Sequence, residues 1–327
     1  MKAIGLLSGG IDSTLAAKLI IDQGIQVEAL KFTSPFCNCD NGGKCHSAEA
    51  AAELGLPLIT IVKGDEYLKV VRSPKYGYGS HMNPCIDCRI FILSKAREYA
   101  NKSGATFVFT GEVLGQRPMS QHRAALTIIE RESGLAGKLL RPLSAKYLPE
   151  TDVEKAGIVD RSKLIGITGR SRKPQFELLR KFNIRTFSCP AGGCLLTDPG
   201  FAARLRDFLS WSSTLSMTDV LLLKHGRHFR NGASRIAVGR NETENGILET
   251  LYADRGIVLK PRVVMGPSSV LFGGSLGRDG IEYAAHLTAS YCDTYKRNVE
   301  IEYAGRGIRG VFNAETHDKS FYRDSLI

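Results

Sequence analysis

The sequence predicts an α/β protein, in which a parallel sheet covered by helices is followed by a smaller α+β domain. Short apolar runs alternate with helical patterns over residues 1–112, and Gly, Pro or polar residues bound each run. Such alternation implies right-handed crossovers between parallel strands and a nucleotide-sized crevice at the strand ends. Beyond about Phe201 the pattern changes, and strands and helices form a separate segment.

The expected elements of the first part follow one another in a regular order. Short apolar or alternating runs predict strands at residues 2–8, 25–32, 57–63 and 105–112. Helical periodicity predicts helices at residues 12–24, 46–55 and 88–104. We therefore expect the parallel sheet in the first half of the chain.

The second part has its own set of expected elements. Strands are expected at residues 235–240, 258–266, 299–304 and 308–314, and helices at residues 243–255 and 279–295. We therefore predict two domains, residues 1–200 and residues 201–327.

Composition excludes several classes of protein. With 327 residues, 43% of them hydrophobic, the chain can bury a sizeable core. No run approaches the roughly 18 to 20 apolar residues that span a bilayer, and the N-terminus breaks too early for a secretory signal, so we expect a cytoplasmic protein without a membrane partner. The net charge of +11 favours a polyanionic partner. In a reducing compartment, eight cysteines indicate metal, cluster or catalytic thiols.

The segment SGGIDST, residues 8–14, separates the first expected strand from the first expected helix. Gly9 and Gly10 let the backbone approach a ligand closely, and the start of the helix supplies N–H groups and a positive dipole. Asp12 can cap the helix or hold Mg²⁺. The hydroxyl donors of the segment are Ser8, Ser13 and Thr14. The segment suits a phosphate, although a glycine turn with an Asp cap is the plain alternative.

SGGIDST resembles the signature of the PP-loop ATP pyrophosphatases over all seven residues. The resemblance implies an adenine nucleotide alpha hydrolase-like fold that binds ATP. It also implies cleavage between the α and β phosphates, with activation of a substrate oxygen as an adenylate. The Gly-Lys-Ser/Thr ending of a Walker loop is absent. ATP and Mg²⁺ are therefore the expected cofactors, with Asp12 as a catalytic residue.

Four cysteines narrow the chemistry. Cys85 and Cys88 stand in a C-x-x-C spacing at the start of a helical pattern, where two sulfurs can converge on one metal or cluster. Cys189 and Cys194 follow in SCPAGGCLLTDPG, flanked by Gly and Pro that let the backbone fold closely. A structural zinc site of all four cysteines is one interpretation, and an iron–sulfur site is the other.

NPCIDCR resembles the motif of iron–sulfur-dependent tRNA thiouridine synthetases, in which two cysteines and a distant third hold a [4Fe-4S] cluster with one open iron. GGCLLTDP is similar to the catalytic cysteine segment of the 2-thiouridine and 4-thiouridine enzymes. The resemblance thus implies Cys85, Cys88 and Cys194 as cluster ligands, with Cys189 as a rival to Cys194. Either could also deliver a persulfide, so both are candidate catalytic residues.

FTGEVLGQRPMSQ, residues 109–121, closely resembles the Thr-Gly-Glu-x-Leu-Gly-Gln block of the 4-thiouridine synthetases, and LLRPL follows it as it does there. The resemblance implies that Gly111 and Gln116 help to bind ATP and that Arg117 approaches nucleotide or RNA phosphates. An ordinary solvated loop is the alternative for that pair. We find neither an N-terminal RNA-capture domain nor a rhodanese-like segment. A different RNA-binding part and a separate sulfur donor, either sulfide or a persulfide-carrying protein, are therefore expected.

The C-terminal region is expected to meet the RNA. HGRHFRNGASRIAVGRNETENGILETL resembles the RNA-binding domain of the NFACT proteins, and residues 221–240 hold five Lys or Arg and no Asp or Glu. His or Phe in this stretch could stack on a base while arginines meet phosphates. The arginines expected at RNA are Arg227, Arg230, Arg235 and Arg240. A second basic segment, residues 161–185, could extend the track; a solvated basic face is the plain alternative.

A further loop, FCNCDNGGKCHS, brings three sulfurs and an imidazole together. Its candidate zinc ligands are Cys37, Cys39, Cys45 and His46. The C-x-C spacing is unusual for structural zinc, so sulfur relay and an ordinary surface loop remain alternatives.

The sequence as a whole predicts ATP-dependent tRNA thiolation, with 4-thiouridine favoured over 2-thiouridine by the Gly-Glu-x-Leu-Gly-Gln block. Two other functions remain open: adenylation of another acceptor, and a tRNA- or ribosome-binding factor that uses ATP as a signal. The basic C-terminal half disfavours the first, and the three cluster cysteines disfavour the second. Whether the chain acts as a monomer or a homodimer is left open.

Overall fold

The structure is a computed structural model that describes residues 1–37, 45–187, 194–274 and 276–327. Within it the chain divides into two compact units, Met1–Thr197 and Asp198–Ile327. Cys39 and Cys189 lie outside the described residues. No helix of the described chain has both the length and the apolar character that a membrane crossing requires.

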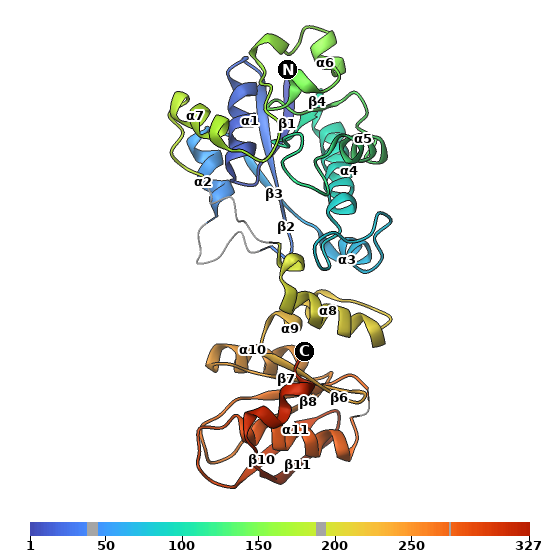
Figure 1. Ribbon diagram of the computed structural model, residues 1–327, viewed down its shortest axis with the longest axis vertical. Coiled ribbons are helices and arrows are strands. Elements are labelled where there is room, and N and C mark those ends of the chain that lie inside the picture. Colours follow the sequence, from blue (N-terminus) through green and yellow to red (C-terminus); the bar gives the residue numbers. More distant parts are fainter. Residues whose placement is uncertain (38–44, 188–193, 275) are drawn as a thin grey trace. The chain divides into compact units, whose positions relative to one another are not determined.

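Unit 1 is built on a five-stranded sheet of order β3-β2-β1-β4-β5 (Figure 1), in which every neighbouring pair is parallel. Its strands are β1 (Lys2–Leu6), β2 (Gln26–Thr33), β3 (Leu58–Val62), β4 (Phe107–Phe109) and β5 (Leu139–Leu140). The central strand β1 is almost wholly buried, as expected for a strand covered on both faces. This confirms the predicted α/β class with a parallel sheet.

Helices cover both faces of this sheet (Figure 1). One core joins the sheet to α1 and α7, and a second core joins it to α4 and α5. The helices of unit 1 are α1 (Ile11–Ile21), α2 (His46–Glu53), α3 (Gly64–Arg72), α4 (Cys85–Ser103), α5 (Arg123–Glu132), α6 (Asp152–Lys155) and α7 (Lys173–Lys181). Short 3₁₀ turns lie at Ala145–Tyr147, Arg161–Lys163 and Leu195–Thr197.

Unit 2 contains a six-stranded sheet of order β11-β10-β8-β9-β7-β6, in which the neighbouring strands are antiparallel. The strands are β6 (Arg227–Asn231), β7 (Ser234–Val238), β8 (Ile257–Pro261), β9 (Ser269–Phe272), β10 (Asn298–Gly305) and β11 (Ile308–Glu315). The helices are α8 (Pro199–Trp211), α9 (Met217–Lys224), α10 (Glu242–Tyr252) and α11 (Arg278–Ser290), and a 3₁₀ segment covers Lys319–Ser325. The predicted α+β class of this part is confirmed.

Local chemistry explains several of the element boundaries. Helix α4 ends at Gly104, whose φ of 70° is the left-handed conformation common after helices. Helix α8 begins with Asp198 as the capping side chain and Pro199 as the first helical residue. The β10–β11 hairpin turns through Arg306 and Gly307, both with positive φ, as a two-residue turn between twisted strands requires.

Candidate active site

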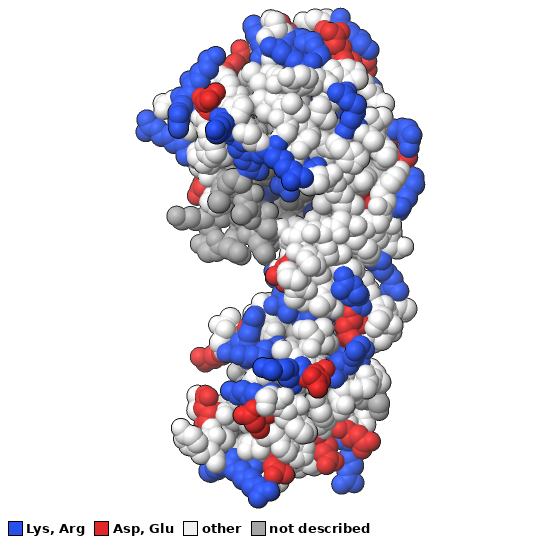
Figure 2. Space-filling model, in the orientation of Figure 1, with Lys and Arg blue, Asp and Glu red and all other residues white. Residues whose placement is uncertain are grey.

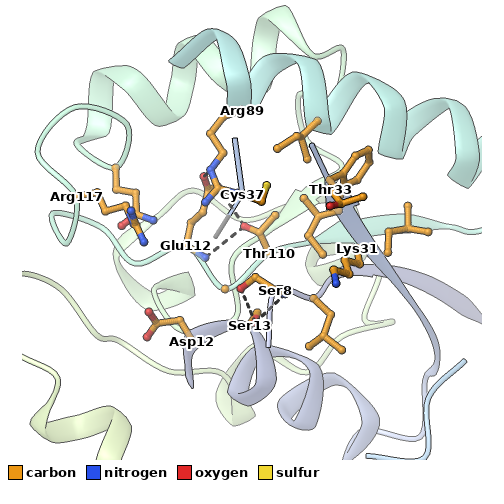
Figure 3. Close-up of a pocket in the computed structure, with 17 residues that line it drawn as sticks. Ser8, Asp12, Ser13, Lys31, Thr33, Cys37, Arg89, Thr110, Glu112 and Arg117 are labelled. Atoms are coloured by element: carbon orange, nitrogen blue, oxygen red, sulfur yellow. Dashed lines mark hydrogen bonds and ion pairs between the residues drawn. The ribbon is translucent and has the colours of Figure 1, made fainter. Parts of the chain in front are cut away.

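A pocket opens at the carboxyl ends of the parallel strands of unit 1 (Figure 3). Because β2 and β4 flank β1 on opposite sides, the chain order reverses next to β1, which is where open α/β sheets bind ligands. The pocket is lined from β1 and the loop after it, from β2, from α4 and from the loop after β4. Its polar lining residues include Ser8, Asp12, Ser13, Lys31, Arg89, Thr110, Glu112 and Arg117.

The loop between β1 and α1 presents a helix start to this pocket. No side chain caps the N-terminus of α1 at Gly10, so the first-turn N–H groups have no capping acceptor. The Ser8 and Ser13 hydroxyl oxygens lie 3.2 Å apart, and Ser13 donates to the Gly10 carbonyl at 2.9 Å. Such an uncapped helix start favours an anion.

The glycines of this region allow close packing. Gly9 has a φ of +75°, and a Cβ there would lie 2.5 Å from the backbone of His46 and Ser47. A Cβ at Gly111 would lie 2.4 Å from the carbonyl carbon of Asp12. Gly9 and Gly111 therefore pack backbone against backbone, and any side chain at either position would push the loop out of place.

Thr14 is placed differently from the other hydroxyl residues of the loop. It is fully buried, and its Oγ1 donates to the Gly10 carbonyl at 3.1 Å. Thr14 therefore braces the loop from inside, whereas Ser8 and Ser13 line the pocket.

Asp12 is held by two side-chain amides. Gln116 Nε2 donates to Asp12 Oδ2 at 2.7 Å, and Gln175 Nε2 lies 3.2 Å from Asp12 Oδ1 and 3.1 Å from Gln116 Oε1. Gln175 comes from α7 and is fully buried. The two amides are donors that fix the orientation of the carboxylate at the pocket.

Three guanidinium groups lie at or near this pocket. Arg172 lies 3.9 Å from Asp12, and Arg89 and Arg117 line the pocket. Desolvation lowers the pKa of Arg117, and the charges of Arg89 and Arg172 lower it further. Mutual repulsion among cations is relieved by a bound polyanion, so this end of the pocket suits phosphates.

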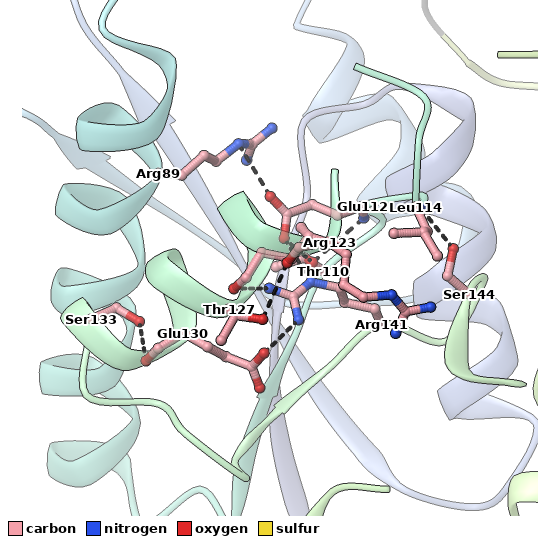
Figure 4. A network of polar contacts seen from close by, with 11 residues as sticks. Arg89, Thr110, Glu112, Leu114, Arg123, Thr127, Glu130, Ser133, Arg141 and Ser144 are labelled. Atoms are coloured by element: carbon pink, nitrogen blue, oxygen red, sulfur yellow. Dashed lines mark hydrogen bonds and ion pairs between the residues drawn. The ribbon is translucent and has the colours of Figure 1, made fainter. Parts of the chain in front are cut away.

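Arg89 is positioned by a buried network beneath the pocket (Figure 4). Arg89 Nε lies 3.5 Å from Glu112 Oε1, and Arg141 Nε donates to Glu112 Oε2 at 3.1 Å. Arg141 also reaches Glu130 at 3.0 Å. Burial raises the pKa of Glu112, but Arg141 and Arg89 outweigh it and hold the pKa below its usual range. Glu112 is therefore an ionised, buried anchor for two arginines.

The cysteines expected at a cluster gather at the start of α4. Cys85 and Cys88 occupy its first turn, and Lys63 Nζ lies 3.7 Å from Cys88 Sγ. Cys194 forms a β-bridge with Cys37. Burial foremost, with the neighbouring sulfurs of Cys88 and Cys37, raises the pKa of Cys194 to about 12. Burial and then Cys88 also raise the pKa of Cys85.

Cys85, Cys88 and Cys194 are ligands of the type that binds an iron–sulfur cluster. Within the described residues, no three His, Cys, Asp or Glu side chains are grouped as ligands of a single metal ion. An iron–sulfur cluster is larger than one ion, so its cysteine ligands stand further apart. The sulfur chemistry of Cys85, Cys88 and Cys194 matches such a group, and, besides burial, the charge of Cys88 raises the pKa of both other thiols.

The described members of the expected zinc loop have separate partners. Cys45 Sγ accepts a hydrogen bond from Lys31 Nζ at 3.0 Å, and His46 Nδ1 lies 3.2 Å from Glu49. Cys37 faces the Ser34 hydroxyl at 3.4 Å and the Cys194 backbone. The structure thus does not bring Cys37, Cys45 and His46 together around one point.

The basic residues of unit 2 fall into two groups. Arg230 and Arg240 keep half-exposed guanidinium groups that pair with Asp207 and Glu244, and Arg227 lies 5.2 Å from the Tyr291 ring. Arg235 is buried; it bonds to Asp207 at 2.6 Å and to backbone carbonyls, so it holds α8 against the sheet. This position leaves Arg235 without a free donor face for a phosphate.

The expectation that a ring of this stretch stacks on a base is corrected by the structure for His228 and Phe229, and for the partly exposed His225 it stays a prediction. His228 and Phe229 are 2% and 1% exposed, since β6 turns both rings into the core. The two rings lie next to each other in a strand and both are buried, whereas a basic loop would have left both rings in solvent.

Comparison with protein-family models identifies the family of the chain. The model described as "Thiamine biosynthesis protein (ThiI)" matches residues 1–178, more than half of the sequence. The chain belongs to the ThiI family. A second model, for the NFACT protein RNA binding domain, matches residues 226–316 of this ThiI-family chain.

Several relatives of the ThiI-family chain are tRNA-modifying proteins by name. It is 34% identical over 114 residues to the tRNA-specific 2-thiouridylase MnmA of Syntrophotalea carbinolica, covering 32% of each chain. It is 27% identical over 190 residues to the probable tRNA sulfurtransferase of Thermococcus kodakarensis, covering 54% of this chain and 44% of the relative. The chain thus spans less than half the length of either relative.

Among solved structures, a 4-thiouridine synthetase in complex with RNA and ATP matches the ThiI-family chain with a TM-score of 0.35 and 22% identity. The match covers 68% of this chain and 52% of that one.

Sequence analysis did not identify several residues that form the site of this ThiI-family protein. Arg89, Arg172 and Gln175 approach Asp12 or line its pocket, yet none belongs to the PP-loop segment. Arg89 directly follows Cys88, so a search for a cation beside the cysteine motif could have found it. No local signal marks Gln175, because its contact with Asp12 spans 163 residues of chain.

Proposed function

We propose that this ThiI-family protein is an ATP-dependent tRNA sulfurtransferase. The observation that carries the proposal is that the uncapped start of α1, the Asp12 carboxylate and the arginine cluster meet at one pocket, in the same unit as the three cysteines. The names of the relatives support the same class of reaction.

The first step is adenylation. A uridine carbonyl oxygen attacks the α-phosphate of ATP, the α–β phosphoanhydride bond breaks, and pyrophosphate leaves with the bonding electrons. The N–H groups at the start of α1 and the guanidinium groups of Arg89, Arg117 and Arg172 stabilise the charge that develops on the phosphates. Asp12, fixed by Gln116 and Gln175, is the residue that would hold Mg²⁺, which neutralises phosphate charge.

The second step replaces oxygen with sulfur. A sulfur nucleophile adds to the activated carbon, AMP leaves with the former carbonyl oxygen, and a thiocarbonyl remains. Cys85, Cys88 and Cys194 would hold a [4Fe-4S] cluster, which would bind and activate the sulfur that is transferred. Because burial raises the pKa of Cys194 to about 12, its free thiol stays protonated at neutral pH, which disfavours an unaided thiolate at this position.

A persulfide on Cys194 is the competing route for sulfur delivery. In that route a persulfide-carrying protein would load Cys194, whereas the cluster route takes sulfide. The Lys63 ammonium beside Cys88 stabilises anionic sulfur in either case.

For the product we propose 4-thiouridine, on the strength of the block around Gly111 and Gln116. A 2-thiouridine product is the second candidate, and the name of the MnmA relative favours it. Unit 2 is proposed to bind the tRNA through Arg227, Arg230 and Arg240, supported by the match to the NFACT RNA binding domain.

The test begins with protein purified without oxygen, for which iron, sulfide and zinc are quantified. The protein is then incubated with ATP, Mg²⁺, sulfide and unmodified tRNA, and the digested RNA is examined by nucleoside mass spectrometry. We expect iron and sulfide in equal amounts and ATP-dependent 4-thiouridine. Cys88→Ser should lose both the iron and sulfide content and the formation of 4-thiouridine. Cys292→Ser, a matched control in unit 2, should lose neither.

Three outcomes separate the alternatives. Formation of 2-thiouridine would change only the atom that is attacked. Thiolation by iron-free protein that depends on Cys194, and that occurs when a persulfide-carrying protein replaces sulfide as the donor, would favour the persulfide route. Pyrophosphate release with no thiolated nucleoside would overturn the proposed function and direct the search to another acceptor.

A further inference from the structure

Helix α7 presents an unusual outward face. Residues 173, 176, 177, 180 and 181 follow the i, i+3, i+4, i+7, i+8 spacing of one helix stripe, and all five are exposed. The opposite stripe, which includes Gln175 and Leu179, is buried against α1. The outward stripe carries three cations, one carboxylate and Phe176, whose ring is 40% exposed.

The cations on and next to this stripe are available to a partner. We define the α7 surface as Arg170, Lys173, Phe176, Arg180 and Lys181. Among the described residues, none of its four cations has an ion-pair partner, although Glu177 lies between them in sequence. Two other arginines of the same basic segment have acidic partners. Arg161 pairs with Glu154, and Arg172 lies 3.9 Å from Asp12. Figure 2 shows blue side chains gathered where Figure 1 places α7.

The aromatic residue distinguishes this surface from an ordinary solvated basic face. Phe176 packs edge-on against Phe187, with 6.3 Å between ring centroids, and still keeps 40% of its surface exposed. An exposed ring among unpaired cations suits single-stranded nucleic acid, where a base stacks on the ring and phosphates meet the cations.

The α7 surface also lies next to the pocket. Arg172, directly before α7, is 3.9 Å from Asp12, and Gln175 on the inner stripe hydrogen-bonds to Asp12. A nucleic acid strand on the outer stripe would therefore run beside the ATP-cleaving site.

We propose that α7 is an RNA-contact element of the catalytic unit, which guides a single-stranded segment of the tRNA to the pocket. The inference rests on the proposed function, since it takes tRNA as the ligand, and adds a contact surface that is separate from unit 2.

The experiment measures binding of fluorescently labelled unmodified tRNA to the full chain at several salt concentrations. Arg170→Ala/Arg180→Ala/Lys181→Ala removes three charges from the α7 surface. We expect affinity to fall about tenfold or more, and the slope of log K against log[salt] to fall by about 2. Phe176→Ala should weaken binding about fivefold or more with an unchanged slope, because stacking releases no counterions.

The matched control removes three exposed cations from other elements of unit 1. Lys102, Lys138 and Lys155 are exposed, and the triple alanine variant changes the net charge equally. It should bind tRNA like the unchanged protein. Thermal melting of all variants checks that they fold.

Two results would overturn the inference. The first is equal loss of tRNA affinity in the α7 and control triple variants, which would show a general charge effect. The second is displacement of tRNA by polyglutamate of equal charge together with no effect of Phe176→Ala, which would indicate an acidic protein partner. Absence of thiolation with intact α7-dependent binding would instead reject only the proposed reaction.

Discussion

The side-chain amide of Gln116 donates a hydrogen bond to the carboxylate of Asp12, with 2.7 Å between Nε2 and Oδ2. Gln175, from a helix more than 160 positions later in the chain, completes the arrangement by facing both residues. The orientation of the Asp12 carboxylate at the pocket is thus set by α7, which carries Gln175, and by the loop after β4, which carries Gln116.

Gln175→Leu should slow pyrophosphate release. The substitution keeps the volume of the buried side chain but removes a donor from Asp12, so the carboxylate is no longer fixed for its task. We expect kcat to fall about tenfold, with the KM for tRNA nearly unchanged, because Gln175 lies on the inner stripe of α7. Steady-state release of pyrophosphate measures both constants.

The matched control for this prediction is Gln26→Leu. Gln26 is exposed at the start of β2, so its loss should leave both kinetic constants in place. If Gln175→Leu lowered the melting temperature without lowering kcat, the residue would be structural only. Gln175→Glu should slow release further, since a second carboxylate beside Asp12 repels the first.

Gly9→Ala should slow pyrophosphate release by more than the strain of a positive φ explains. The φ of +75° alone costs roughly 1 kcal/mol in an L-residue, and the added Cβ would also meet the backbone of His46 and Ser47 at 2.5 Å. The loop must then move, and a displacement of this size costs about a hundredfold in rate. Pyrophosphate release and urea unfolding should be measured together.

Gly24→Ala separates strain from the clash. Gly24 has nearly the same φ, +76°, but a Cβ there meets nothing within 4 Å. We expect a loss of roughly 1 kcal/mol in unfolding free energy with unchanged kinetics. Equal kinetic effects of the two substitutions would argue against close packing of Gly9 as the cause.

The sequence predicted those parts of the fold that depend on local patterns. The alternation of runs predicted β1 to β4, and the glycines of SGGIDST predicted the turn into α1, although the strand ends at Leu6 and the helix begins at Ile11. Strands β5, β6 and β9 were missed. Strands β5 and β9 have two and four residues, too few for a periodic signal, and the burial pattern of β6 does not alternate. The local motif thus indicated where the pocket begins.

The rest of the site depends on contacts that a local pattern does not contain. Arg235 and Arg230 have the same charge and lie in one hairpin, yet Arg235 is buried on Asp207 while Arg230 is half exposed. Both pair with Asp207 of α8, but Arg235 is also bonded to the backbone carbonyls of Gly232 and Ala233. Net charge along the sequence therefore overestimated the number of arginines available to RNA.

Glu112→Gln should destabilise unit 1. The neutral amide leaves the buried guanidinium of Arg141 without its main counter-charge, and breaking a buried ion pair from one side costs about 3 kcal/mol or more. Urea unfolding at neutral pH measures the loss. Glu98→Gln is the control, since the Glu98–Lys95 pair is exposed and should contribute under about 1 kcal/mol. If both variants lost the same unfolding free energy, the buried Glu112–Arg141 pair would stabilise the protein no more than the exposed Glu98–Lys95 pair.

His228 should make the stability of unit 2 depend on pH. Burial, with the charge of Arg204, lowers the pKa of His228 to about 4 from an ordinary value of 6.5. Between these values the unfolded chain binds a proton that the folded chain does not, so folded stability is complete above pH 6.5 and is lost as the pH falls toward 4. The shift corresponds to about 3 kcal/mol.

The groups around His228 define how the measurement is made. Desolvation also lowers the pKa of His225, which therefore contributes in the same direction, while Glu244, with a pKa of about 2, acts only below about pH 4.5. Urea unfolding followed by the fluorescence of Trp211, the single tryptophan of the chain, reports on unit 2 between pH 4.5 and 7. His228→Gln keeps a donor for the His225 carbonyl but does not titrate, so its stability should fall less steeply with acid. If the unfolding free energy fell equally steeply with acid in the unchanged protein and in His228→Gln, the pH dependence would come from His225 and not from His228.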